Sequence, residues 1–198
     1  MKKNEKEYMP ESLPRTEELE AELKRILYQK RFGQVLRSTV YILVIVAAVT
    51  ILISVLFLPV LKIYGTSMSP TFDKGDIVIS FKGGSMDTGD IIAFYYNNKI
   101  LVKRVIANSG DWVNIDENGT VSVNGKKLEE TYLTEKALGN CNIELPYQVP
   151  DDKVFVMGDH RSTSVDSRNT AVGCVAQEQI VGKITFRIWP LNRLGILH

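Results

Sequence analysis

Residues 38–61 read STVYILVIVAAVTILISVLFLPVL and contain no charged side chain over 24 positions. An α-helix rises about 1.5 Å per residue, so this stretch forms a helix of roughly 36 Å, enough to cross a bilayer core of about 30 Å. A cleaved signal peptide has a shorter apolar core that lies closer to the N-terminus. A fully buried core helix of this length is unusual in so small a chain. The stretch therefore predicts a membrane-spanning helix.

The basic residues on either side predict the orientation of this span. Five lie shortly before it and two follow it closely: Lys24, Arg25, Lys30, Arg31 and Arg37, then Lys62 and Lys74. By the positive-inside rule the N-terminus lies in the cytoplasm. No later stretch is long and apolar enough for a second span. We therefore expect a single-pass protein of the cell membrane whose C-terminal part is extracytoplasmic.

The span divides the chain into three regions. Residues 1–37 are expected to form a charged cytoplasmic tail, and 17–37 to be a helix with one apolar stripe made by Leu19, Leu23, Ile26 and Leu27. Residues 62–198 form a 137-residue unit, which is large enough to bury a core of its own.

The outer unit has the pattern of a β domain. Short runs rich in β-branched or aromatic residues occur at 77–80, 91–95, 100–107, 112–115, 121–123, 154–157 and 180–188. The dipeptides Asn118-Gly119 and Asn124-Gly125 predict tight turns, so residues 112–128 are expected to form a small hairpin unit. We expect it to belong to an inserted β subdomain of about residues 111–150. No helical pattern alternates with the strands, which argues against a parallel sheet. We predict a mainly β, mostly antiparallel domain behind one transmembrane helix.

Composition excludes several classes of protein. The chain has 24 Lys and Arg against 23 Asp and Glu, so it has no basic footprint for nucleic acid. Its two histidines, His160 and His198, and two cysteines, Cys141 and Cys174, are too few for a Cys/His zinc site. A Ser-His-Asp enzyme would depend on His160, because a chain-terminal histidine is a poor base. The sequence does not decide between a disulfide that joins Cys141 to Cys174 and two free thiols.

Two stretches carry candidate reactive groups. Residues 64–71 read YGTSMSPT, where Gly65 and Pro70 place Ser67 in a constrained turn, although such serines are usually only turn formers. Residues 100–106 read ILVKRVI, which puts Lys103 and Arg104 on opposite faces of a strand. One of the two then lies among apolar neighbours. A desolvated lysine can lose its proton, whereas an arginine stays protonated. An edge strand with both side chains in water is the alternative.

A third stretch is rich in short polar side chains. Residues 157–168 read MGDHRSTSVDSR and follow a predicted strand. Two arginines, two aspartates and several hydroxyls favour an ordered polar network, although a solvated surface loop has a similar composition.

Together these stretches resemble the bacterial type I signal peptidases, membrane-bound serine proteases that use a serine–lysine dyad. The matching segments, in order, are SMSPT (67–71), GDIV (75–78), KRV (103–105), GD (110–111), GDHR (158–161) and SVDSR (164–168). The resemblance covers roughly residues 38–187, including the membrane span, and the single anchor is similar to that of the Gram-positive members.

The resemblance implies roles for individual residues. Ser67 would be the nucleophile, Lys103 the general base, and Ser164 the group that orients the lysine amine. Four further residues would support the site: Asp159, Arg161, Asp166 and Arg168. No metal, nucleotide or other cofactor would be required.

The resemblance also implies the substrates. The family removes signal peptides from preproteins after small residues of the A-x-A kind, and its shallow apolar pockets would be shaped here by Ile63, Met68, Phe72 and Leu101. A base near neutral pH needs the lysine pKa lowered by roughly 2–3 units, which burial can supply.

Two departures from the family pattern concern the surroundings of the nucleophile. His160, Ser162 and Thr163 stand where many members have Asn, Asp and Asn. Gly65 stands where Gram-negative members have a serine hydroxyl that stabilises the oxyanion, so the Ser67 N–H would carry more of that role.

Two other classes of protein compete with a peptidase. A signal-peptidase-like adaptor, for example in pilus assembly, would have lost catalytic residues, whereas Ser67 and Lys103 are both present. A self-cleaving regulator of the LexA type would carry a DNA-binding helix-turn-helix, whereas this N-terminus leads into the span. The peptidase is therefore favoured.

Overall fold

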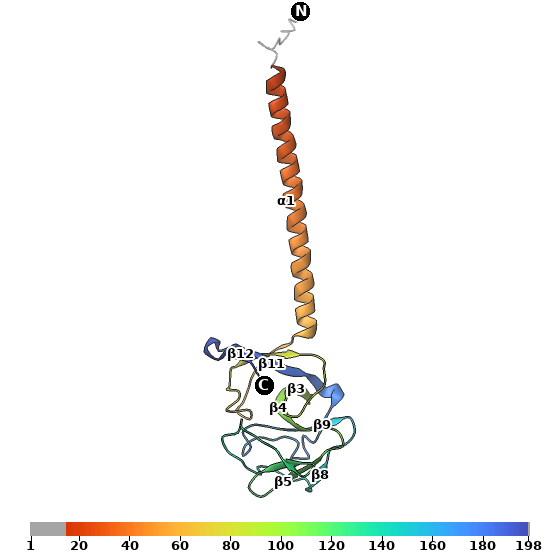
Figure 1. Ribbon diagram of the computed structural model, residues 1–198, viewed down its shortest axis with the longest axis vertical. Coiled ribbons are helices and arrows are strands. Elements are labelled where there is room, and N and C mark those ends of the chain that lie inside the picture. The colour runs from red at the N-terminus through yellow and green to blue at the C-terminus, as the bar shows by residue number, and fades with distance from the viewer. Residues whose placement is uncertain (1–14, 198) are drawn as a thin grey trace, which may run out of the picture. The chain divides into compact units, whose positions relative to one another are not determined.

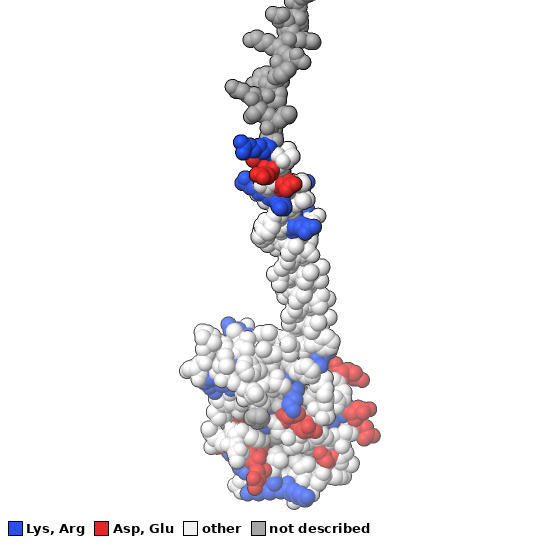
Figure 2. Space-filling model, turned by 45° about the horizontal axis from the view of Figure 1, so that its top comes forward, with Lys and Arg blue, Asp and Glu red and all other residues white. Residues whose placement is uncertain are grey.

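The computed structural model describes residues 15–197, which divide into two compact units, one before and one after the boundary between Leu52 and Ile53. One helix, α1 (Thr16–Phe57), runs for 42 residues through the charged segment and most of the predicted span (Figure 1). Figure 2 shows the charges on its N-terminal part followed by an uncharged stretch. No residue of α1 is buried, and its most apolar 18 residues have a mean hydropathy of 3.0. It is long and apolar enough to cross a membrane.

The helix ends four residues earlier than the predicted span, at Phe57 rather than residue 61. Pro59 explains the difference, because the residue before a proline is disfavoured in the helical conformation. Val60 and Leu61 instead begin strand β1 (Val60–Lys62), which pairs with β2 (Ile77–Phe81). Residues 1–14 of the predicted cytoplasmic tail lie outside the described part of the chain.

The second unit is built on two antiparallel sheets. The larger has the order β1-β2-β11-β3-β4-β9-β10, and β12 pairs with β11 beside this path. Its other strands are β3 (Ile91–Tyr96), β4 (Lys99–Ala107), β9 (Lys153–Met157), β10 (Val175–Ala176), β11 (Ile180–Trp189) and β12 (Gly195–Ile196). Two 3₁₀ turns, η1 (Gln177–Gln179) and η2 (Leu191–Arg193), flank β11. The predicted fold class, mainly β and mostly antiparallel behind one apolar helix, is confirmed.

The smaller sheet lies within the region predicted to hold the inserted subdomain. Its order is β7-β6-β5-β8, from β5 (Trp112–Ile115), β6 (Val121–Val123), β7 (Lys126–Lys127) and β8 (Tyr147–Gln148). Between β6 and β7 the chain turns at Asn124 and Gly125, which have φ angles of 51° and 75°. A two-residue hairpin turn requires such positive φ values, and Asn-Gly adopts them most readily.

Strand β4 lies between β3 and β9 in the larger sheet: β3 pairs with its residues from Lys99 to Arg104, and β9 pairs with it from Arg104 onward. Its residues from Lys103 to Ala107 are all buried, because apolar clusters cover both faces of the sheet. The alternative of an edge strand with both basic side chains in water is therefore wrong: Lys103 is 3% exposed and Arg104 is 2% exposed.

Candidate active site

Three segments far apart in the sequence meet at Lys103. Ser67 lies in the turn between β1 and β2, Lys103 on β4, and Ser164 in the turn after β9. The Lys103 Nζ lies 2.7 Å from the Ser67 Oγ and 2.9 Å from the Ser164 Oγ. A hydroxyl, an amine and a second hydroxyl within hydrogen-bond reach form the arrangement of a nucleophile, a base and a group that orients the base.

The environment of Lys103 favours its neutral form. Burial lowers the pKa of Lys103 from 10.5 to about 8, because desolvation penalises the ammonium. The charges of Asp166 and Asp159 oppose this shift, and that of Arg168 adds to it. The hydrogen-bond partners of the amine are the two neutral hydroxyls. A buried lysine without a touching carboxylate is suited to accept a proton near neutral pH.

The turn that carries Ser67 is fixed by its neighbours in the chain. Gly65 has a φ of 89°, a backbone conformation that side chains disfavour. After Ser67 the buried side chains of Met68 and Phe72 anchor the turn in the core, and the Phe72 N–H donates to the Met68 carbonyl. Among residues 15–197 the Ser67 N–H donates no hydrogen bond, so it is available to a ligand.

Gly158 allows the turn after β9 to approach Ser67. A Cβ atom at this position would lie 2.3 Å from the Ser164 Oγ and 2.5 Å from the Ser67 carbonyl oxygen, closer than real Cβ contacts. The backbone N–H of His160 donates to that same Ser67 carbonyl at 3.0 Å. Only glycine therefore lets Ser67 and Ser164 reach Lys103 together.

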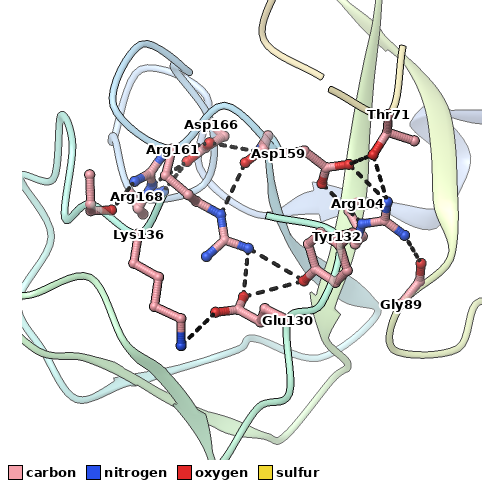
Figure 3. A network of polar contacts seen from close by, with 12 residues as sticks. Thr71, Gly89, Arg104, Glu130, Tyr132, Lys136, Asp159, Arg161, Asp166 and Arg168 are labelled. Carbon is pink, nitrogen blue, oxygen red and sulfur yellow. Dashed lines mark hydrogen bonds and ion pairs between the residues drawn. The ribbon is translucent and has the colours of Figure 1, made fainter. Parts of the chain in front are cut away.

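The four predicted supporting residues are all buried and form ion pairs (Figure 3). Asp159 accepts two hydrogen bonds from Arg104, Nε to Oδ1 at 3.0 Å and Nη2 to Oδ2 at 2.8 Å. It also accepts one from the hydroxyl of Thr71, four residues after Ser67. This pair therefore connects the segment that carries Ser67, β4 and the turn after β9.

Asp166 forms a second ion pair with Arg168, through Nε to Oδ1 at 2.8 Å and Nη2 to Oδ2 at 2.9 Å. Although burial opposes its ionisation, the hydrogen bonds from Arg168 lower the pKa of the Asp166 carboxyl below its ordinary value. Asp166 Oδ2 also accepts from the Gly158 N–H at 2.9 Å. The pair fixes the backbone at the point where Gly158 meets Ser67.

Arg161 pairs with a residue that sequence reasoning missed. Its Nη2 lies 2.6 Å from Glu130 Oε1, and both side chains are fully buried. Tyr132, also missed, donates its hydroxyl to Glu130 Oε1 at 3.2 Å. One signal existed in the sequence: the stretches 100–106 and 157–168 together hold four basic residues and only two acidic ones, and a buried arginine needs a carboxylate partner.

A groove of about 740 Å³ leads to Ser67. It is lined on one side by residues 60–65, 67 and 68 and on the other by residues 98–102. Of the predicted pocket residues, Ile63, Met68 and Leu101 line this groove. Phe72 does not; it is fully buried and packs behind Met68 and Ile63.

The residues that depart from the family pattern occupy different environments. His160 contacts Ser67 through its backbone N–H, while its Nδ1 is buried and has no hydrogen-bond partner among residues 15–197. Ser162 and Thr163 are exposed. Cys141 and Cys174 carry free thiols.

Comparison with known proteins gives consistent matches. The family model "Signal peptidase, peptidase S26" matches residues 36–189. Signal peptidase IB of Staphylococcus aureus (strain Mu50 / ATCC 700699) is 38% identical over 151 residues, which cover 66% of this chain and 77% of that protein. Thylakoidal processing peptidase 1, chloroplastic, of Arabidopsis thaliana is 34% identical over 170 residues, 75% of this chain and 48% of that protein. A crystal structure of a signal peptidase I from Enterococcus faecalis V583 covers 52% of this chain and 98% of its own, at 29% identity and a TM-score of 0.42.

Proposed function

The chain belongs to the peptidase S26 family of signal peptidases, and we propose that it performs the family's reaction with Ser67 as the nucleophile and Lys103 as the general base. It is a serine peptidase that removes signal peptides from preproteins. The observation that supports the proposed roles is the contact of Lys103 Nζ with Ser67 Oγ at 2.7 Å inside a buried environment. An adaptor without catalysis has no need of this contact.

The reaction begins with a proton transfer. With a pKa of about 8, roughly one tenth of Lys103 is neutral at pH 7 and half at pH 8. The neutral amine accepts the proton of the Ser67 hydroxyl as its oxygen attacks the scissile carbonyl. Lys103 then returns the proton to the leaving amine, and water releases the acyl-enzyme in a second proton transfer through the same amine.

Ser164 and the four supporting residues act around this pair. The Ser164 hydroxyl, 2.9 Å from Nζ, orients the amine toward Ser67. The supporting residues hold the turn that carries Ser164 through the ion pairs described above: Asp159, Arg161, Asp166 and Arg168.

The negative charge on the substrate oxygen needs a hydrogen-bond donor. The Ser67 N–H, which donates to no other described residue, is the donor we assign. Gly65 has no hydroxyl to contribute, so the backbone N–H of Ser67 carries more of this role. Backbone donors of this kind are fixed before the reaction, which is why they stabilise the developing charge efficiently.

The groove accommodates an extended peptide that ends in small side chains. From Lys99 to Lys103, β4 pairs only with β3, so its other edge is open to an added strand. Ile63, Met68 and Leu101 line the groove with apolar side chains, which suits the alanine side chains of an A-x-A site. The far end of the groove, at Val60, begins three residues after the end of α1, so the signal-peptide side of the substrate enters there.

We place the second unit on the extracytoplasmic side of the cell membrane and the N-terminus in the cytoplasm. The support is the excess of Lys and Arg before the span, together with an α1 long enough to cross the bilayer once. Exported preproteins are the substrates that meet such a site.

The test is cleavage of a preprotein with an A-x-A site by the full-length protein in detergent. We expect the wild type to release the signal peptide, and Ser67→Ala to stop release while the melting temperature stays within a few degrees of the wild type. Cleavage by Ser67→Ala at the wild-type rate would remove Ser67 from the mechanism. Absence of cleavage by the wild type would contradict the proposed function itself.

A further inference from the structure

Glu130 belongs to the inserted region, yet its carboxylate lies in the polar network beside the proposed active site (Figure 3). We propose that Glu130 is a positioning residue for the peptidase reaction: through Arg161 it holds the turn of residues 158–164, which sets both the Ser164 hydroxyl and the Ser67 carbonyl. This inference rests on the proposed function. It gives the inserted region a part in catalysis.

The first link joins Glu130 to Arg161. Glu130 Oε1 accepts a hydrogen bond from Arg161 Nη2 at 2.6 Å and another from the Tyr132 hydroxyl at 3.2 Å. Neither charged side chain has exposed surface, and no other carboxylate among residues 15–197 forms an ion pair with Arg161. The second Glu130 oxygen lies 4.0 Å from Lys136 Nζ. Without Glu130 the buried guanidinium of Arg161 loses its counter-charge. Its present position then becomes unfavourable in free energy, because an unpaired charge is buried there.

The second link joins Arg161 to the turn. Arg161 Nε donates to the Gly158 carbonyl oxygen at 3.0 Å. Gly158 in turn packs against Ser67 and Ser164 so closely that no Cβ would fit between them. Two backbone bonds complete the turn, from His160 N–H to the Ser67 carbonyl and from Ser164 N–H to the His160 carbonyl, each at 3.0 Å. A shift of Arg161 therefore moves the groups that place Lys103.

A third link strengthens the same attachment. The ring of Tyr132 lies under the guanidinium of Arg104, with Cζ 3.9 Å from the ring centroid. Burial and the nearby Glu130 charge raise the pKa of the Tyr132 hydroxyl, so this hydroxyl stays protonated and donates to Glu130. Because Arg104 binds Asp159, residues 130–132 contact the turn through both Arg161 and Arg104. The inserted region therefore holds the start of the turn through two arginines, Arg161 and Arg104.

The experiment compares Glu130→Gln with Glu129→Gln in the full-length protein, with cleavage of the A-x-A preprotein as the assay. Glu129 is the matched control, because it is the same residue type one position earlier and is exposed. We expect Glu130→Gln to lower kcat about tenfold or more with KM within about twofold, since positioning affects the reacting groups and not the groove. Glu129→Gln should leave both constants within about twofold.

A double-mutant cycle tests the route through Arg161. In an Arg161→Gln background, Glu130→Gln should lower kcat by less than about twofold more, because the link is already broken. A full tenfold further loss in that background would overturn the route. A folded Glu130→Gln protein with the wild-type kcat would overturn the proposal.

A milder variant keeps the proposal testable if Glu130→Gln does not fold. Tyr132→Phe keeps the ring on Arg104 and removes only the hydroxyl, which donates to Glu130 and accepts from Arg161 Nη2 at 3.4 Å. We expect kcat to fall about threefold with KM unchanged, and an unchanged kcat would contradict the proposal. Since the wild type is assayed alongside, failure of the proposed function appears as no cleavage by any protein and is a different result.

Discussion

Lys103 and Arg104 are neighbours on one strand and are equally buried, but their surroundings differ. The charge of Arg104 is compensated by its partners on one face of the strand, whereas the charge of Lys103 is not compensated on the other. Arg104 meets a carboxylate through two hydrogen bonds, a backbone carbonyl and an aromatic ring, so its charge is compensated. Lys103 meets only two hydroxyls, and its pKa falls to about 8. A buried cation with an adjacent anion keeps its proton, and one without it becomes a base. The fold therefore makes one structural and one reactive cation from adjacent residues.

The largest expected effect comes from exchanging the cation on the Lys103 face. Lys103→Arg should lower kcat/KM by about 10³-fold or more, because arginine stays protonated and cannot accept the proton of Ser67. The reverse exchange, Arg104→Lys, keeps a cation beside Asp159 and should lower it by only about tenfold. Cleavage kinetics of both variants measure the contrast. A Lys103→Arg protein that keeps a hundredth of the activity would show that the two faces do not differ in the proposed way.

The same substitution on the two faces should change stability with opposite signs. Arg104→Met leaves Asp159 buried without its partner and should cost about 3–5 kcal/mol of unfolding free energy. Lys103→Met should stabilise the protein by up to about 3 kcal/mol at pH 7, because it removes the penalty that lowers the lysine pKa.

The pH dependence follows from the direction of the Lys103 shift. The folded pKa, about 8, lies below the unfolded value of 10.5, so the unfolded state binds more protons between these values. The free-energy penalty of burying Lys103 is complete below pH 8 and disappears as the pH rises toward 10.5. The gain in unfolding free energy from Lys103→Met should therefore shrink over that window. Denaturant unfolding at pH 7 and pH 10 measures it. A constant advantage would mean that the pKa of Lys103 is not lowered.

The smallest expected effect concerns His160. Its contact with Ser67 uses the backbone N–H, which any residue except proline supplies, so His160→Ala should change kcat/KM by less than about threefold. The cleavage assay that detects the loss in Lys103→Arg checks this. A fall of a hundredfold would mean that the imidazole has a chemical role beside the lysine.

Much of the fold could be predicted from the sequence, because strands buried on both faces appear in it as runs of β-branched or aromatic residues, such as residues 91–95 and 100–107. The end of α1 could not, since the apolar run continues beyond Pro59 into β1 and hides the boundary. The strands missed within residues 15–197 are only two or three residues long, and some of them, such as β8 and β10, pair with strands distant in the sequence.

The candidate site likewise has a part that the sequence predicted and a part that it did not. Ser67, Lys103 and Ser164 lie in segments that resemble family motifs, and the structure brings them together; their roles stay a prediction. Glu130 and Tyr132 carry no local signal, because Glu130 meets Arg161 across 31 residues of sequence. The alternation of side chains between the two faces of β4 could not show which basic residue is reactive either. The partners decide it, and Asp159 lies 55 residues beyond Arg104.

The most direct test of the central claim, that Lys103 acts as a neutral base made by burial, is the pH dependence of kcat/KM for preprotein cleavage, measured from pH 6 to 10 on the wild type and on His160→Ala. We predict an activity that rises with pH to a midpoint at about 8, the same in both proteins, because deprotonation of Lys103 generates the active form. A midpoint near 6.5 that disappears in His160→Ala, or an activity still rising through pH 10, would contradict the account.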